Sequence, residues 1–218
     1  EIKISNSEIQ IQIDKFEFSV SSNHISVLES GLAKSRGGVG EAAAVLSRMN
    51  LSLDSWLYHP QLDEVATLAD AHPNLTIILN HVGSPILGGP YRGKSDEVFA
   101  DWRTRIKSVG ERPNVFVKLG AMPIRMPGFD GDRSLPPRSE EVAAAWRPWI
   151  ETCIEAFGPS RSMFESNFPV QKRWCSYQVC WNAFKRLAAG ASDTEKQDLF
   201  AGAAARAYRM DERANSLG

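Results

Sequence analysis

Hydrophobic and polar residues alternate over the first twenty positions. Isoleucine occupies positions 2, 4, 9, 11 and 13, and Phe16, Phe18 and Val20 continue the same spacing. A period of two is typical of strands with one buried face. The pattern therefore predicts one or two strands that end near residues 21–23. A helix is predicted to begin at the glycines of residues 37–40 and to run to about residue 49.

From residue 51 onward, short apolar runs alternate with longer amphipathic stretches. The predicted strands are 51–58, 75–81, 114–119 and 161–165, and the predicted helices are 61–71, 96–109, 139–157, 176–189 and 193–208. This alternation predicts parallel βαβ units in an α/β fold, with a sheet that is covered on both faces. Pro73, Pro113 and Pro159 each precede a predicted strand, which supports the boundaries.

Composition narrows the classes of partner. The 218 residues include 25 Lys and Arg against 26 Asp and Glu, so no basic field favours nucleic acid. No apolar run approaches the roughly 18 residues that a membrane span needs. The three cysteines form no CxxC pair, and a reducing cytoplasm is the expected location. Since the chain begins with Glu1 and shows no signal sequence, we expect a fragment or a processed product.

Candidate chemistry lies where the predicted strands end, because the carboxyl ends of parallel strands meet at one edge of a sheet. Extended geometry would place Glu165 and Asn167 on one face with Met163. It would place His81 on one face with Ile77 and Leu79. For His81, a ligand-binding role and a buried, hydrogen-bonded role are equally open.

Four further residues are candidate substrate contacts. The pattern does not decide whether His59 or its neighbour Tyr58 faces inward. Lys118 either binds a substrate carboxylate or extends into solvent. Arg92 and Arg125 lie in the loops after the second and third of these strands and could hold an anion with two hydrogen bonds, although a solvated surface position is the commoner state. No glycine-rich stretch has the spacing of a nucleotide-binding loop.

Four segments together resemble the amidohydrolase-related family, which includes pyrone-dicarboxylate lactonase and sugar lactonases. They are SWLYHPQL at 55–62, PNLTIILNHVGSP at 73–85, NVFVKLG at 114–120 and FGPSRSMFESNFP at 157–169. The resemblance spans about residues 38–210. It implies a (β/α)8 barrel, and the four strands resemble its strands five to eight.

The resemblance also implies roles for individual residues. Family members bind a divalent metal or substrate with a His-x-His pair and a strand-six histidine, which His81 matches. A strand-eight aspartate is the family's general base, but Asn167 occupies that position, and an amide cannot accept the proton. Glu165 is the predicted replacement. Asn80 stands where the family has an acidic residue, which would change how His81 is oriented.

The amino-terminal part departs from the family. Only about fifty residues precede the strand that resembles strand five, and a barrel needs about 250 residues in all. We therefore expect the carboxyl-terminal half of a barrel at 37–218 and a divergent, strand-rich segment at 1–36. No His-x-His pair occurs in the chain. With His81 as the matched ligand and at most His59 and Glu165 to assist it, a divalent metal such as zinc and no metal at all are equally open.

The leading functional hypothesis is a hydrolase of a lactone, ester or amide bond in a small carboxylated molecule. Glu165 would take a proton from water, His81 would polarise the carbonyl or bind a metal, and Lys118 or Arg125 would hold the substrate carboxylate. One alternative is an inactive, truncated barrel that serves as a binding module or remnant. Another is a decarboxylase of the same superfamily. Exposed sheet edges would favour association with a second copy.

Overall fold

The computed structural model describes the backbone of residues 2–5, 8–13, 16–21, 24–28, 38–122 and 136–210. Side chains are described for residues 39–122 and 136–210. Arg125 therefore lies outside the described residues, and its predicted role stays a prediction. Among the described helices, none has the length and hydropathy to cross a bilayer.

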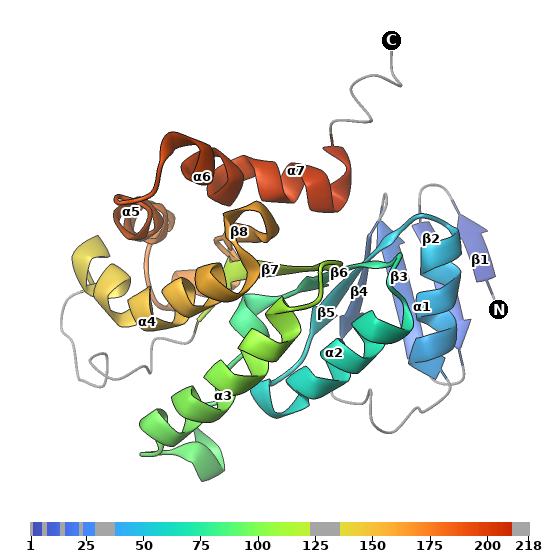
Figure 1. The fold of residues 1–218 in the computed structure, drawn as a ribbon, viewed down its shortest axis with the longest axis horizontal. Coiled ribbons are helices and arrows are strands. Elements are labelled where there is room, and N and C mark those ends of the chain that lie inside the picture. The colour runs from blue at the N-terminus through green and yellow to red at the C-terminus, as the bar shows by residue number, and fades with distance from the viewer. Residues whose placement is uncertain are drawn as a thin grey trace.

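The described residues form one sheet of eight strands whose order in space is their order along the chain. The strands are β1 (Ile2–Ser5), β2 (Glu8–Ile13), β3 (Phe16–Ser21), β4 (His24–Leu28), β5 (Ser52–Trp56), β6 (Thr76–Leu79), β7 (Val115–Gly120) and β8 (Ser162–Glu165). Neighbouring strands from β1 to β4 pair antiparallel, whereas neighbouring strands from β4 to β8 pair parallel. The predicted parallel βα units are confirmed, and Figure 1 shows the amino-terminal strands at one end of the sheet.

The helices match their predicted positions closely. They are α1 (Gly38–Arg48), α2 (Leu62–Ala71), α3 (Ser95–Gly110), α4 (Ser139–Phe157), α5 (Tyr177–Leu187), α6 (Asp193–Gln197) and α7 (Ala203–Tyr208). Ser192 caps the helix that was predicted to begin at residue 193, because its hydroxyl accepts a hydrogen bond from the Glu195 N–H at 3.3 Å. A π-helical turn, Asp198–Gly202, joins α6 to α7, so the predicted helix over 193–208 is continuous.

The parallel strands β5–β8 bury both faces of the sheet, as predicted. One face carries Leu53, Ile77 and Val117, which pack with α1 to α5 in the main hydrophobic core. The opposite face carries Ile78 and Met163, which pack against the alanines of α7. Figure 1 shows α2 and α3 on one side of these strands and α7 on the other. We call the second side the α7 face.

The amino-terminal prediction of one or two strands is wrong, because the described part of the chain before α1 contains four strands. The isoleucine and phenylalanine alternation is shared by β1, β2 and β3, so the period alone could not count the strands. The amino-terminal strands were predicted to end near residues 21–23, yet β4 begins at His24. The boundary between 1–36 and 37–218 stays a prediction, and β4 pairs with β5 across it.

Candidate functional site

His81 and Glu165 meet at the carboxyl ends of β6 and β8. The ring nitrogen Nδ1 of His81 forms a short hydrogen-bonding contact with the carboxylate oxygen Oε1 of Glu165. The backbone N–H of His81 donates to the same oxygen at 3.1 Å. The His81 side chain is 22% exposed and that of Glu165 is 15% exposed. Both side chains are therefore partly accessible to solvent, and two contacts fix their relative position.

The backbone after β6 takes a conformation that the sequence did not predict. His81, Val82, Gly83 and Ser84 all have positive φ, between 41° and 69°. Left-handed backbone costs free energy for residues other than glycine and is concentrated at functional sites. Surrounding contacts hold this turn, since Trp102 Nε1–H donates to the Val82 carbonyl at 2.7 Å.

This turn corrects the predicted face of His81. Ile77 and Leu79 pack on the face that α1 to α5 cover, as an extended strand requires. His81 instead contacts Glu165, which shares its face with Met163 of the α7 face. The strand ends at Leu79, and the positive φ of His81 breaks the alternation of side chains between the two faces. The period of two therefore does not predict the face of the His81 side chain.

Glu165 is positioned by close packing against β7. Gly120 pairs with Glu165 in the parallel ladder. A Cβ atom at Gly120 would lie 2.0 Å from the Glu165 carbonyl oxygen and 2.9 Å from its Cγ. Only glycine fits this approach, because no side-chain atom is tolerated at such distances.

Asn167 is not joined to the pair by a hydrogen bond. Its φ is 48°, so the extended geometry that was to align it with Glu165 ends before it. Its carbonyl accepts the Gln171 N–H at 3.0 Å, but its side-chain amide makes no hydrogen bond with any described residue. The structure therefore brings together His81 and Glu165, while Asn167 lies two residues beyond them.

Lys118 is held in an ion pair. Its Nζ lies 2.9 Å from Oδ1 of Asp54, whose side chain is 1% exposed. The hydroxyl of Tyr208 donates to the same oxygen at 2.9 Å, and the Lys118 ammonium lies 5.6 Å from the centre of the Tyr208 ring. Burial, and then the Asp54 charge, raise the pKa of Tyr208, so its hydroxyl remains a donor. Lys118 is thus neither free in solvent nor an uncompensated cation.

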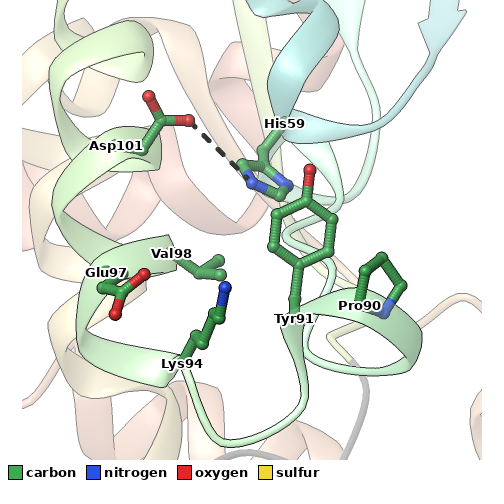
Figure 2. Close-up of a pocket in the computed structure, with 7 residues that line it drawn as sticks. All are labelled: His59, Pro90, Tyr91, Lys94, Glu97, Val98 and Asp101. Carbon is green, nitrogen blue, oxygen red and sulfur yellow. Dashed lines mark ion pairs between the residues drawn. The ribbon is translucent and has the colours of Figure 1, made fainter.

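His59 lies in a separate pocket of about 360 Å³ that also involves residues of α3 (Figure 2). Its ring is 1% exposed, and Nδ1 accepts the Ile86 N–H at 3.2 Å. Nε2 faces Asp101 at 3.9 Å. Burial lowers the pKa of His59 more than the Asp101 carboxylate raises it, which favours the neutral ring. His59 therefore supports the loop that follows His81 and does not join Glu165.

The aromatic residue that faces the pair comes from β5. The rings of Trp56 and His81 are 6.3 Å apart, and Tyr58 lies 6.1 Å from Trp56 with 43% of its surface exposed. Of the two residues that the sequence left undecided, Tyr58 thus lies toward this site and His59 away from it. Arg92, in the loop before α3, is exposed and makes no ion pair with a described residue.

Sequence reasoning missed Asp54, Tyr208 and Trp56. Asp54 carried a signal, because a carboxylate inside the apolar run 51–58 must be paired if it is buried. The sequence gives no sign that Tyr208 contacts Asp54, because the two residues lie 154 positions apart.

The donor set does not fit a closed metal site. His81 and Glu165 offer two ligands, and no group of three His, Cys, Asp or Glu residues that could hold a metal occurs among the described residues. A structural or catalytic zinc ion takes at least three protein ligands. The described residues therefore do not assemble a zinc centre.

Comparison with known proteins identifies the family. The sequence model of the amidohydrolase family matches residues 23–210. The chain belongs to the amidohydrolase family. It is 38% identical to the uncharacterized protein y4mH of Sinorhizobium fredii, over 76% of this chain and 49% of that protein. The L-fucono-1,5-lactonase of Burkholderia multivorans is 29% identical, over 75% of this chain and 53% of the lactonase.

A solved amidohydrolase has a similar fold. The crystal structure of an amidohydrolase from Burkholderia multivorans with bound zinc aligns with a TM-score of 0.66 and 26% identity, over 78% of this amidohydrolase and 56% of that chain. The family resemblance expected from the sequence is thereby confirmed. The chain spans about half the length of the curated relatives it matches.

Proposed function

We propose that this amidohydrolase hydrolyses a lactone of a small hydroxylated acid through an activated water. The contact between His81 and Glu165 at the carboxyl edge of the sheet carries the proposal. Support for a lactone comes from the similarity to L-fucono-1,5-lactonase. The ester, the amide and the inactive binding module remain alternatives to it.

The hydrogen bonding favours His81 as the proton acceptor, with Glu165 positioning it. Glu165 Oε1 accepts a hydrogen bond from the Nδ1–H of His81, which selects the tautomer whose Nε2 carries a lone pair. Nε2 would remove a proton from water while the water oxygen bonds to the lactone carbonyl carbon. The ring C–O bond then breaks, and the departing alkoxide takes the proton back from Nε2. The product is the open hydroxy acid. The sequence analysis predicted Glu165 as the group that takes the proton from water. Both choices of general base, His81 and Glu165, use the same pair of residues.

A direct assay tests the proposal. The full chain is incubated with a panel of five- and six-membered aldonolactones, with and without added Zn²⁺, and acid release is followed by pH-stat titration. His81→Asn is the control for contaminating activity. Acid release that depends on His81 supports hydrolysis, and release no faster than in the His81→Asn control contradicts it.

The same samples address the remaining alternatives. Carbon dioxide release from an aromatic carboxylate would favour the decarboxylase. Association with a second copy through the sheet edges also remains a prediction, and light scattering after size-exclusion chromatography gives the mass that tests it.

A further inference from the structure

The pocket beside His59 lies along the first turns of α3, apart from the reactive pair. Its volume of about 360 Å³ falls within the range of small-molecule pockets. One side is formed by residues that recur at helical spacing, namely Lys94, Glu97, Val98 and Asp101. Figure 2 shows these side chains facing His59 and Tyr91 across the pocket.

His59 directs an unused hydrogen-bond donor into this pocket. Its side chain is 1% exposed, and Nδ1 accepts the Ile86 N–H at 3.2 Å, so the proton of the neutral ring lies on Nε2. Nε2 lies 3.9 Å from the Asp101 carboxylate, beyond hydrogen-bonding distance, and no other described residue accepts from it. Because a buried donor without an acceptor is destabilising, a ligand atom that accepts from Nε2–H would be bound favourably.

Two opposite charges of the pocket lack an ion-pair partner among the described residues. Lys94 and Glu97 are both exposed, and neither forms an ion pair with the other or with any described residue. Asp101 differs, because Arg105 Nε donates to both of its carboxylate oxygens at 3.0 Å. The pocket thus offers one ammonium group and one carboxylate whose charges are not compensated within the described part of the chain.

This charge pattern favours a zwitterion over a simple ion. A dicarboxylate or a phosphate would bring its negative charges close to Glu97 and Asp101, and a diamine would meet the charge of Lys94. An α-amino acid carries a carboxylate and an ammonium group on one carbon atom. Its carboxylate can accept from His59 Nε2–H and from Lys94, while its ammonium group donates to Glu97.

Apolar surface in the same pocket suits a hydrocarbon side chain. Pro90, the ring of Tyr91 and Val98, which is 2% exposed, line the pocket beside the charged groups. The Tyr91 ring stands edge-on to the His59 ring, with 5.2 Å between the ring centres. Contact with these groups would remove an apolar side chain from water, which favours larger apolar amino acids over glycine.

We propose that the pocket between α3 and His59 binds a free α-amino acid with an apolar side chain. Lys94 and His59 hold its carboxylate, and Glu97 holds its ammonium group. Neither His81 nor Glu165 lines this pocket, so the site is separate from the proposed hydrolysis. Binding can therefore be measured without any turnover.

Matched analogues test the need for both charges. Isothermal titration calorimetry on the full chain compares L-leucine with 4-methylpentanoate, which lacks the ammonium group, with 3-methylbutylamine, which lacks the carboxylate, and with glycine. L-Phenylalanine is compared in the same way with 3-phenylpropanoate and 2-phenylethylamine. We expect at least one of the two amino acids to bind at least tenfold more tightly than glycine and than both of its own analogues. Equal binding of each amino acid and its carboxylic acid or amine, or no binding of either amino acid, would overturn the inference.

Two charge variants test the two ends of the ligand separately. Lys94→Met should weaken binding of the preferred amino acid at least tenfold without weakening that of its matching amine. Glu97→Gln should cause a similar loss for the amino acid without weakening binding of its matching carboxylic acid. Lys107→Met and Glu111→Gln, which change exposed residues at the far end of α3, are the matched controls and should bind as wild type. Unchanged affinity in either pocket variant, or an equal loss in the controls, contradicts the proposed contacts.

His81→Asn distinguishes this pocket from the reactive pair. We expect the variant to bind the preferred amino acid within twofold of wild type, because His81 does not line the pocket. A tenfold loss of binding in His81→Asn would place the amino acid at the reactive pair and overturn the inference. Absence of lactone hydrolysis would contradict the proposed function alone, since none of these binding measurements depends on turnover.

Discussion

His81 offers two groups, its backbone N–H and its ring Nδ1, to a single oxygen of Glu165, a residue 84 positions later in the chain. One contact fixes the position of the histidine backbone and the other fixes the orientation of its ring. A pair held in this way loses little freedom on reaching the transition state, which is the physical advantage of a preorganised site.

Removal of the imidazole is predicted to abolish turnover. His81→Asn is the informative change, because asparagine tolerates the φ of 58° and leaves the backbone turn intact. We expect kcat for lactone hydrolysis to fall at least about 100-fold, as for the loss of a general base. His72→Asn, at the opposite end of the sheet, should leave kcat unchanged. A His81→Asn enzyme within a few fold of wild type would refute the assignment of the base.

Gly120 is predicted to be indispensable for the placement of Glu165. In Gly120→Ala, the new Cβ would clash with the Glu165 carbonyl at 2.0 Å, so β7 or β8 must move. We expect a loss of about 1–3 kcal/mol in the free energy of unfolding and a larger loss of kcat. Gly190→Ala, where no atom lies within 4 Å of the added Cβ, is the control. Urea titration and lactone kinetics measure both effects, and equal behaviour of the two variants would contradict this account.

The sequence predicted the βα order and the positions of the later helices well, because long apolar periodicities depend on local spacing alone. α4 begins and ends at the predicted residues 139 and 157. The faces of the side chains just after the strands were harder to predict, because a single residue with left-handed backbone reverses the face of a side chain. His and Asn adopt positive φ more often than most residues, but the residue type alone does not fix the backbone, and both face predictions depended on extended backbone there.

The partners of the Asp54 carboxylate could not be predicted from the sequence. Lys118 and Asp54 lie on strands separated by β6, and Tyr208 reaches them from the last described helix. Such contacts depend on the tertiary arrangement of distant segments. The sequence could therefore indicate a charged residue at a strand end, but not that its charge is already compensated.

The Lys118–Asp54 pair is predicted to stabilise the fold more than it binds substrate. Lys118→Met removes the ammonium group that lies 2.9 Å from the Asp54 carboxylate, which is 1% exposed, and we expect a loss of about 3–5 kcal/mol in the free energy of unfolding. The double variant Lys118→Met with Asp54→Asn should recover part of this loss, because no buried charge remains. Guanidinium titrations of the single and double variants measure the difference. A double variant less stable than Lys118→Met would speak against this interpretation.

His59 is predicted to make the fold sensitive to mild acid. Its pKa is lowered in the folded chain, so between pH 6.5 and that lower value the unfolded chain binds more protons. The stability contribution is therefore complete above about pH 6.5 and declines as the pH falls through the lowered pKa. In His59→Asn, whose Oδ1 can still accept the Ile86 N–H, the unfolding free energy should fall less between pH 7 and pH 5. Parallel pH profiles of the two proteins would count against the buried neutral ring.

The kcat of Glu165→Gln for the preferred lactone tests the central claim most directly. Glutamine keeps the size of the side chain but removes the negative charge that stabilises the His81 imidazolium formed when Nε2 takes the proton, so we predict a fall in kcat of about 10²–10⁴-fold with little change in KM. Glu151→Gln, an exposed carboxylate on α4, should behave as wild type. A Glu165→Gln chain that retains kcat within twofold of wild type would contradict the proposal that His81 and Glu165 act as one catalytic pair.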